Sequence, residues 1–502
     1  MRPLRGSGNV KVMRLEDELA TWLLAQRWFA GKGRTLRDLA IVADTEVAGG
    51  DPALRHLIVL VSHGATADHY QIPIGLRSQL PDWLEHARIG TADDGRQAYD
   101  ALHDPALTRH LIRAIAASQT IESLTFTREP GAEIETELDS IVLTAEQSNT
   151  SLVFGEQSIL KVFRRVFPGP NPDLEVTSAL SRLGSPHVAE PFGSIETIMD
   201  GVTTTLAILS RYLRTATDGW TLAATSVRDL YASNLYASDT YATGPFPVPT
   251  GSGPTGSRLT GSRLAGSRLT GSGDQGPGAG AAGAGGDFAG EAHRLGAATA
   301  EVHGDLAEAF GTDELSPEAI HDLAEQMFRR LDLTTAAVPE LARYTDMIGS
   351  AYSSVAKINE PVPAQRVHGD YHLGQVMRTE TGWIILDFEG EPASPLSQRR
   401  ARSSPMRDVA GMLRSFDYAA RFQLLNHPDA ERLQGVAREW IRRNSAAFCA
   451  GYAEAGGPDP VANEVLLRAL QLDKAVYEVM YEARHRPSWL QIPLDSLADF
   501  PD

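Results

Sequence analysis

The chain is poor in features that define several classes of protein. Its 502 residues include one cysteine, Cys449, so no internal disulfide is possible. Small residues surround it in "AAFCAGYAEA", and we expect it to be a buried hydrophobe rather than a nucleophile. No apolar run reaches the roughly 18 residues that a membrane-spanning helix needs, and the first residues lack the apolar segment of a signal peptide. We therefore expect a cytoplasmic protein without a membrane-spanning segment.

Basic residues are also scarce. Lys and Arg number 46 against 64 Asp and Glu, which gives a formal net charge of −18. Proteins that bind nucleic acid through its phosphates usually carry a basic patch, and the chain offers no Lys/Arg run longer than "RRAR" at 399–402. We therefore expect neither a nucleic-acid partner nor an anionic membrane surface. A phosphate ligand stays compatible, because a few placed cations and a metal ion can neutralise one.

The chain is too long for a single domain of about 150 residues. Residues 1–125 combine a helical pattern at 14–28 with strand-like stretches, and we interpret them as a small front domain. Residues 126–214 hold short strands, and residues 215–502 mostly show the 3.6-residue periodicity of helices. Within that half, residues 233–286 are rich in Gly, Ser, Ala, Pro and Thr and contain the repeat "GSRLTGSRLAGSRLT". Such a composition cannot offset its ordering entropy, so we predict a disordered insertion.

Chemistry is concentrated in "QRVHGDYHLGQVMRTETGWIILDFEGEP", residues 365–392. Two strand-like stretches are joined by a turn at Gly382, and a hairpin returns its ends to one place. Asp370, Gln375 and Asp387 should therefore converge at one rim. Two carboxylates and a carboxamide provide the hard oxygen ligands that Mg²⁺ prefers. One carboxylate must stay available to accept a proton, so we assign Asp370 as the base and Gln375 and Asp387 as metal ligands.

The pattern H-G-D-x-H-x-x-Q followed by D-F-E resembles the kinase-like phosphotransferases, in their aminoglycoside phosphotransferase branch. Asp370, Gln375 and Asp387 match the order of the kinase catalytic Asp, the metal-binding Asn and the Asp of D-F-G. Gln replaces Asn, and Glu389 stands where the kinase Gly would be, as an additional metal or water ligand. The resemblance implies a bilobal α+β fold, with a strand-rich nucleotide lobe, a helical C-terminal lobe and an N-terminal cap domain. It also implies ATP as donor and Mg²⁺ as cofactor.

The same resemblance implies a nucleotide site upstream of the hairpin. Lys161 in "SILKVFRR" would contact the phosphates, and Glu175 in "PDLEVTSAL" would hold that lysine in place. The turn that covers the phosphates would be "AEQSNTSLVFGE", which lacks G-x-G-x-x-G but contains Ser148 and Thr150 as hydrogen-bond donors, with Asn149 and Ser151 beside them. The adenine would lie along Leu209 to Arg211, which resemble a hinge.

A C-terminal helix is predicted in "LQLDKAVYEVMYEARHRPSWLQIPL", ending at Pro487. Its apolar stripe leaves Lys474, Tyr477 and Tyr481 on the opposite side, and two tyrosines beside a lysine favour a polar cleft lined with aromatic rings. Sugars suit such a surface, because their C–H faces pack on rings while their hydroxyls meet polar groups. The flanking pair, Glu478 and Glu482, is expected to be solvated.

Five stretches together resemble the actinobacterial maltokinases: "QRWFAGKGR", "HGDYHLGQ", "DFEGEP", "SPMRDVAGMLRSFDYAA" and the C-terminal helix. This resemblance implies transfer from ATP to maltose, giving maltose 1-phosphate for α-glucan synthesis. It implies that Lys474, Tyr477 and Tyr481 contact the sugar, with His372 and Asp370 near the acceptor hydroxyl. It also implies a possible association with a trehalose synthase, and a cap in which Trp28 and "AGKGR" order the nucleotide lobe.

Three alternatives remain open at this point. A glucosamine kinase of the same fold would need carboxylates that face an ammonium group; Glu478 and Glu482 are candidates, but the Lys474 cation argues against it. An aminoglycoside kinase would need a broader acidic surface. A catalytically silent scaffold of a trehalose-pathway enzyme would bind nucleotide without transfer, and the intact Asp370 and Asp387 count against it.

Overall fold

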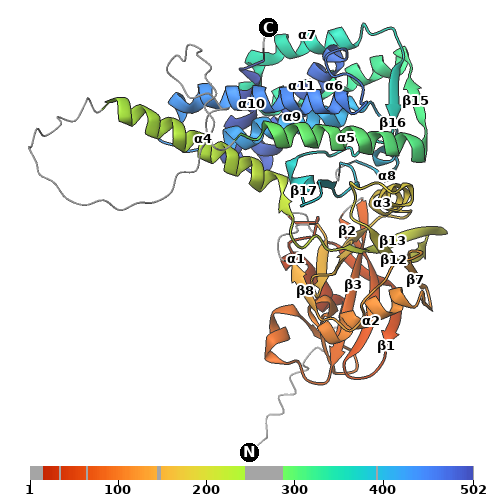
Figure 1. Cartoon of the computed structure of the whole chain (residues 1–502). Coiled ribbons are helices and arrows are strands. Elements are labelled where there is room, and N and C mark those ends of the chain that lie inside the picture. The colour runs from red at the N-terminus through yellow and green to blue at the C-terminus, as the bar shows by residue number, and fades with distance from the viewer. Residues whose placement is uncertain are drawn as a thin grey trace, which may run out of the picture.

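The computed structural model describes residues 15–32, 36–63, 66–143, 148–242, 287–391 and 394–500, with the side chains of helix α4 described up to residue 235. The described residues form three consecutive parts, which we call the cap (15–117), the strand-rich lobe (118–218) and the helical lobe (219–500) (Figure 1). The predicted boundary at residue 125 falls inside strand β7 (Leu124–Arg128), which belongs to the sheet of the strand-rich lobe. No helix among the described residues is long and apolar enough to cross a membrane.

The cap is an antiparallel sheet with a helix on each side. Strand order is β1-β2-β3-β5-β4, and β11 (Arg165–Val166) from the next lobe pairs with β3. Helix α1 packs its buried Leu15, Leu19 and Leu23 on the sheet, and α2 begins at Asp104, whose side chain caps the N–H of Ala106. The bounds are α1 (Leu15–Ala25), β1 (Asp38–Ala48), β2 (Ala53–His63), β3 (Thr66–Arg77), η1 (Asp82–Ala87), β4 (Arg88–Thr91), β5 (Gln97–Asp100), η2 (Ala101–His103) and α2 (Pro105–Ala116).

The strand-rich lobe is a seven-stranded antiparallel sheet of order β6-β7-β12-β13-β10-β9-β8. One apolar cluster joins α2 and strand β2 of the cap to strands of this sheet, so the cap and the lobe share a core. Helix α3 begins at the Asn171 cap and covers the end of the sheet that faces the helical lobe (Figure 1). The bounds are β6 (Thr120–Ile121), β7 (Leu124–Arg128), β8 (Ser140–Leu143), β9 (Thr150–Phe154), β10 (Ser158–Val162), α3 (Pro172–Leu183), β12 (Pro191–Met199), β13 (Val202–Arg211) and β14 (Thr217–Asp218).

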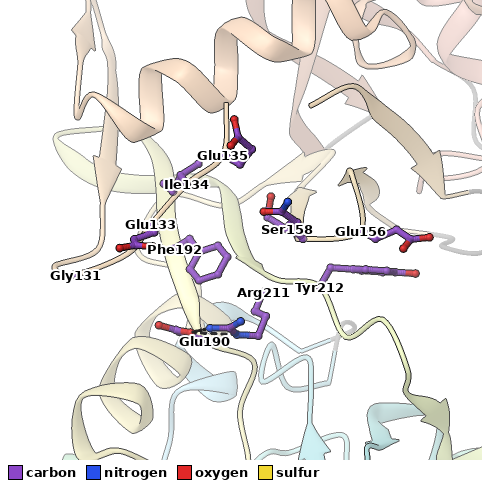
Figure 2. Close-up of a pocket in the computed structure, with 11 residues that line it drawn as sticks. Gly131, Glu133, Ile134, Glu135, Glu156, Ser158, Glu190, Phe192, Arg211 and Tyr212 are labelled. Carbon is purple, nitrogen blue, oxygen red and sulfur yellow. Dashed lines mark hydrogen bonds and ion pairs between the residues drawn. The ribbon is translucent and has the colours of Figure 1, made fainter. Parts of the chain in front are cut away.

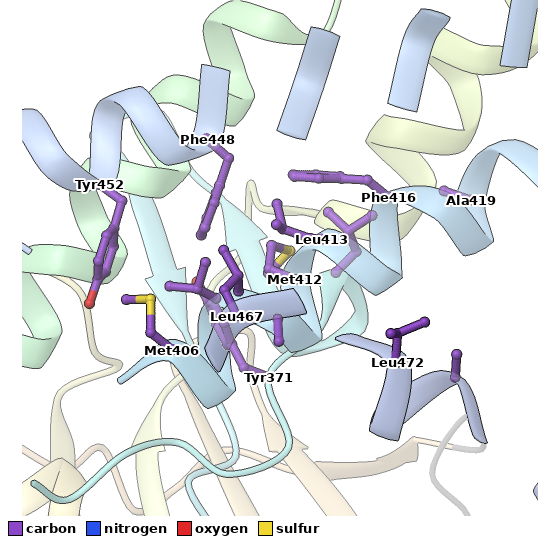
Figure 3. Close-up of a cluster of buried hydrophobic side chains, with 14 of the residues drawn as sticks. Tyr371, Met406, Met412, Leu413, Phe416, Ala419, Phe448, Tyr452, Leu467 and Leu472 are labelled. Carbon is purple, nitrogen blue, oxygen red and sulfur yellow. The ribbon is translucent and has the colours of Figure 1, made fainter. Parts of the chain in front are cut away.

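The helical lobe packs its long helices around one large apolar core, part of which is drawn in Figure 3. Helix α9 lies at its centre, and Tyr371 of the predicted catalytic loop packs into the same cluster. Cys449 is half-buried against this core, and burial raises the pKa of its thiol to about 11, as expected of a packing residue. The bounds are α4 (Gly219–Ala242), α5 (Ala289–Phe310), β15 (Thr312–Leu315), α6 (Pro317–Ala337), η3 (Pro339–Tyr344), α7 (Thr345–Val355), β16 (Val362–Gln365), η4 (Leu373–Gln375), β17 (Val376–Arg378), β18 (Trp383–Ile385), α8 (Leu396–Arg399), α9 (Met406–Phe422), α10 (Ala430–Glu454), α11 (Glu464–His485), η5 (Pro487–Trp489) and α12 (Gln491–Leu497).

The structure differs from the predicted disordered insertion, residues 233–286, at the start of that segment. Helix α4 continues to Ala242, so residues 233–242 are helical rather than disordered. The reason is tertiary packing: the Tyr231 hydroxyl donates to the carbonyl of Ala420 at 3.0 Å, and Leu235 packs on the helical core. Residues 243–286, which include the repeat, lie outside the described residues.

Candidate active site

The predicted hairpin forms from β17 and β18, with Val376 opposite Ile385. Its two ends carry Asp370 and Asp387, and the backbone is tight at both: Gly369 has φ of 85° and Asp387 has φ of 64°. A left-handed conformation is uncommon for a residue with a side chain and is found at functional sites. The Gln375 carboxamide donates to Asp387 Oδ2 at 3.1 Å, so the two predicted metal ligands do lie together.

Asp408 on α9 supports the His-Gly-Asp segment through hydrogen bonds, although the motifs of the sequence did not point to this residue. Its carboxylate accepts hydrogen bonds from the backbone N–H groups of His368 at 2.7 Å and Gly369 at 2.9 Å. The same carboxylate contacts His303 Nε2 at 3.0 Å, and His303 Nδ1 lies 2.8 Å from the Tyr452 hydroxyl. Burial opposes ionisation of Asp408, but its hydrogen bonds with His303 and with Gly369 outweigh it and lower the carboxyl pKa.

Replacing Asp408 with Asn should destabilise the protein by about 2–3 kcal/mol at pH 7, the range for hydrogen bonds to a buried charged group. Because the folded pKa of Asp408 is depressed, its charge stabilises the fold fully above the unfolded pKa of about 3.9 and less as pH falls below it. Denaturant unfolding of both proteins from pH 7 to pH 3.5 measures this. A stability gap that widens as pH falls contradicts the assignment.

Lys161 on β10 lies among three carboxylates. Its Nζ is 2.7 Å from Asp387 Oδ1, 2.7 Å from Glu389 Oε1 and 3.2 Å from Asp173 Oδ2. Burial would raise the pKa of Asp387, but Lys161 holds it at about 2, whereas burial beside negative neighbours raises the pKa of Glu389. Oxygens of the three carboxylates lie within 4.8 Å of one another. These hard ligands fit a divalent cation such as Mg²⁺.

The predicted partner of Lys161 was wrong. Glu175 on α3 instead pairs with Arg400 at 2.6 Å and with Arg366 at 3.1 Å, which ties α3 to the chain on either side of the hairpin. Asp173, in the first turn of the same helix, contacts Lys161 and also accepts from the N–H of Phe388 at 3.0 Å. Helix α3 begins at Pro172, and this start places Asp173, rather than Glu175, opposite Lys161.

A cavity of about 410 Å³, the lysine cavity, opens between Lys161 and the hairpin. Ser148, Asn149 and Ser151 of the predicted phosphate turn line it. Thr150 does not, because side chains alternate along a strand and its hydroxyl accepts a hydrogen bond from the buried Arg164 at 2.8 Å. The turn residues before Ser148 lie outside the described residues.

Arg164 joins the strand-rich lobe to the cap. Its guanidinium pairs with the buried Asp100 of β5 and lies 4.8 Å from the ring of Trp28. The predicted role of Trp28 in ordering the nucleotide lobe therefore has a physical basis, because Trp28 contacts Arg164 and Arg164 donates a hydrogen bond to Thr150. The functional part of that expectation stays a prediction.

Of the predicted hinge, Leu209 to Arg211, only Ser210 lines the lysine cavity. Ile208 and Ser210 line the cavity, while the Leu209 side chain is buried in the core shared with the cap. Arg211 points into an outer groove of about 680 Å³, where it pairs with Glu190 (Figure 2). The side chains of Leu209 and Arg211 therefore face away from the lysine cavity.

A second cavity of about 660 Å³, the tyrosine cavity, lies on the other side of the hairpin. Asp370, His372, Lys474, Tyr477 and Tyr481 all line it, so the five predicted acceptor residues are brought together. Lys474 Nζ lies 3.2 Å from Asp370 Oδ1, and the two tyrosine rings stack with centroids 6.2 Å apart. Burial lowers the pKa of His372, whose Nδ1 accepts from the N–H of Gly374 at 3.0 Å. Gly374 lines both cavities, so they adjoin beside the hairpin.

The expectation that Glu478 and Glu482 are solvated was wrong. Glu478 pairs with the buried Arg414 of α9 at 2.5 Å, and Glu482 pairs with Arg486 at 2.6 Å. Glu482 also accepts from the Tyr418 hydroxyl at 2.5 Å. A helix wheel shows the angle of these residues on α11 but not the basic residues that face them, so sequence periodicity alone could not reveal the pairing.

The chain is similar to known proteins over its cap and over most of its length. Residues 22–104 match the family described as maltokinase N-terminal cap domain. A glucosamine kinase of Streptacidiphilus jiangxiensis is 27% identical over 482 residues, which cover 90% of this chain and 96% of that relative. A glucosamine kinase of Mycolicibacterium smegmatis is 26% identical over 355 residues, covering 70% of this chain and 77% of that relative.

A solved glucosamine kinase, in complex with glucosamine, ADP and inorganic phosphate, covers 96% of this chain and 98% of its own at 22% identity, with a TM-score of 0.64. The fold expected from the sequence, a bilobal α+β kinase-like fold with an N-terminal cap, is confirmed. The chain is a phosphotransferase with an alcohol group as acceptor, built on the kinase-like fold and carrying a maltokinase-type cap.

Proposed function

We propose that this phosphotransferase transfers the γ-phosphoryl group of ATP to the anomeric hydroxyl of maltose, which gives maltose 1-phosphate. The observation that carries the proposal is the position of Asp370. Its carboxylate lines the tyrosine cavity, which adjoins the lysine cavity at Gly374. A hydroxyl held at Asp370 would therefore lie next to a nucleotide held at Lys161.

Each side chain has a role that its position supports. Asp370 accepts the proton of the acceptor hydroxyl, and Lys474 fixes the Asp370 carboxylate through their contact at 3.2 Å. Lys161, with Ser148 and Ser151, would bind the phosphates. The three carboxylates of Asp173, Asp387 and Glu389, with Gln375 beside Asp387, would hold Mg²⁺, which supplies positive charge to the transferring phosphoryl group when bound. His372 and the tyrosines would orient the sugar.

The electrostatics of the tyrosine cavity favour an uncharged acceptor. Glu478 and Glu482 line it, but each is neutralised by an arginine. An ammonium group needs an available carboxylate, and breaking a buried ion pair to provide one is costly. A neutral disaccharide needs hydrogen bonds and flat apolar contacts, which Tyr477 and Tyr481 provide.

A second candidate acceptor is glucosamine, and two findings favour it. The relatives and the solved structure reported above are glucosamine kinases. In addition, Glu391 lines the tyrosine cavity and is only 3.6 Å from Lys474 Nζ, a loose contact that an ammonium group could replace. The association with a trehalose synthase stays a prediction.

Acceptor choice can be tested directly. The protein is incubated with Mg·ATP and maltose, glucose, trehalose or glucosamine, and ³¹P and ¹³C NMR locate the phosphate. Phosphate on the anomeric oxygen of maltose is the expected result, with kcat/KM for maltose at least roughly tenfold above that for glucosamine. Phosphate at O6 of glucosamine, with no product from maltose, would overturn the proposal.

A further inference from the structure

A third cavity of about 350 Å³, the rear cavity, meets the tyrosine cavity at the proposed base. Five residues line both and form a shared wall: Asp370, Glu391, Gly411, Lys474 and Tyr477. The volume falls within the range of about 300–1,000 Å³ that small-molecule sites occupy. None of the roles described so far uses the rear cavity.

The lining of the rear cavity includes an incompletely partnered carboxylate. Asp473 of α11 pairs through Oδ2 with Arg330 of α6. Its other oxygen, Oδ1, is buried and has no hydrogen-bond partner among the described residues. A buried polar atom without a partner is costly unless a ligand or water supplies one. This oxygen is therefore available to accept a hydrogen bond from a group in the rear cavity.

The remaining lining indicates what that group belongs to. Acidic and basic side chains balance, three against three: Asp370, Glu391 and Asp473 with Arg330, Arg407 and Lys474. An uncharged ligand suits a balanced wall better than an anion or a cation does. Apolar side chains cover another part of the wall, namely Leu315, Leu323, Met327, Leu466 and Leu470. A ligand with hydroxyls on its edge and C–H groups on its face matches both features.

We propose that the rear cavity binds the second, non-reacting ring of a disaccharide acceptor, with Asp473 Oδ1 accepting one of its hydroxyls. This inference rests on the proposed function. It makes the rear cavity a length-sensing subsite: the ring with the anomeric hydroxyl occupies the tyrosine cavity, and the second ring reaches past the shared wall. A monosaccharide would leave the rear cavity without sugar contacts and lose the corresponding binding free energy.

The test compares maltose and glucose as acceptors in three full-length variants. Leu323→Trp fills the rear cavity from α6, and Leu333→Trp on the same helix is the matched control, because Leu333 is 69% exposed. Asp473→Ala removes the acceptor oxygen without adding volume. Wild-type protein should prefer maltose over glucose in kcat/KM by at least roughly tenfold. Leu323→Trp and Asp473→Ala should reduce this preference roughly tenfold while KM for ATP changes less than about twofold, and Leu333→Trp should keep it.

The outcomes separate the two proposals. If wild-type protein uses maltose but both rear-cavity variants keep the full preference, the subsite is wrong and the maltose kinase stands. Equal loss for maltose and glucose also contradicts the subsite, since it indicates damage to the shared wall. If wild-type protein uses glucosamine and ignores maltose, the proposed function and the subsite both fail. Thermal melts identify a variant that is not folded, and the other rear-cavity variant then decides.

Discussion

Asp370→Asn should abolish phosphoryl transfer while ATP binding survives. The amide keeps the shape of the carboxylate but cannot accept the hydroxyl proton, and general-base catalysis contributes about 10²–10⁴-fold to rate. Asp370 lines the tyrosine cavity, whereas Lys161 lines the lysine cavity, so the Kd for ATP should change little. Steady-state kinetics with the preferred acceptor and calorimetric titration of Mg·ATP measure the two quantities.

A matched control for this variant is Asp332→Asn, an exposed carboxylate on α6 of the same lobe. It should leave both kcat and the Kd for ATP within about twofold of wild type, as surface substitutions usually do. Turnover of Asp370→Asn that equals the control would refute the base assignment. A large loss of ATP affinity in Asp370→Asn would instead indicate that the loop between the cavities had collapsed.

Lys161→Met should reduce kcat/KM for ATP by about 10²–10³-fold, the range found when one preorganised donor is removed from a charged transition state. Met has a similar length, so it fills the space but leaves Asp173, Asp387 and Glu389 without their common cation. We expect the folded protein to become less stable for the same reason, because unpaired buried charges are costly. Added Mg²⁺ should restore part of that stability.

Two measurements check the effect of Lys161→Met. Initial rates over a range of ATP concentrations give kcat/KM, and thermal melts with and without Mg²⁺ give the stabilisation. Lys357→Met, an exposed lysine after α7, is the control and should behave as wild type. A variant with unchanged kcat/KM for ATP would show that Lys161 is a structural cation only, and a melting temperature insensitive to Mg²⁺ would exclude the three carboxylates as its ligands.

The sequence predicted what is local in the chain. Gln375 and Asp387 belong to one hairpin, so a turn and two short strands suffice to place them together. Lys474, Tyr477 and Tyr481 share one side of α11, so helical periodicity alone groups them. In both cases spacing of a few residues determines the geometry, which is why these groups appear in the structure as expected.

What the sequence could not show depends on partners that are distant in the chain. Asp408 supports the His-Gly-Asp segment across about forty residues of sequence, as the separations of its hydrogen bonds show. Asp173 rather than Glu175 reaches Lys161 because the exact start of α3 decides which carboxylate faces the strand. Glu478 is paired because α9 places Arg414 opposite it. Such contacts follow from packing between elements, which residue type and spacing do not reveal.

The pairing of β11 with β3, together with the apolar cluster common to α2 and the seven-stranded sheet, has a consequence for how the chain can be divided. Deletion of the chain up to residue 117 would remove one side of that apolar cluster. It would also remove Asp100, which leaves the buried Arg164 cation behind Thr150 without its carboxylate partner. The cap is therefore not a separable domain. It is part of the scaffold on which strand β9 rests, and a minimal catalytic fragment has to begin with the first helix.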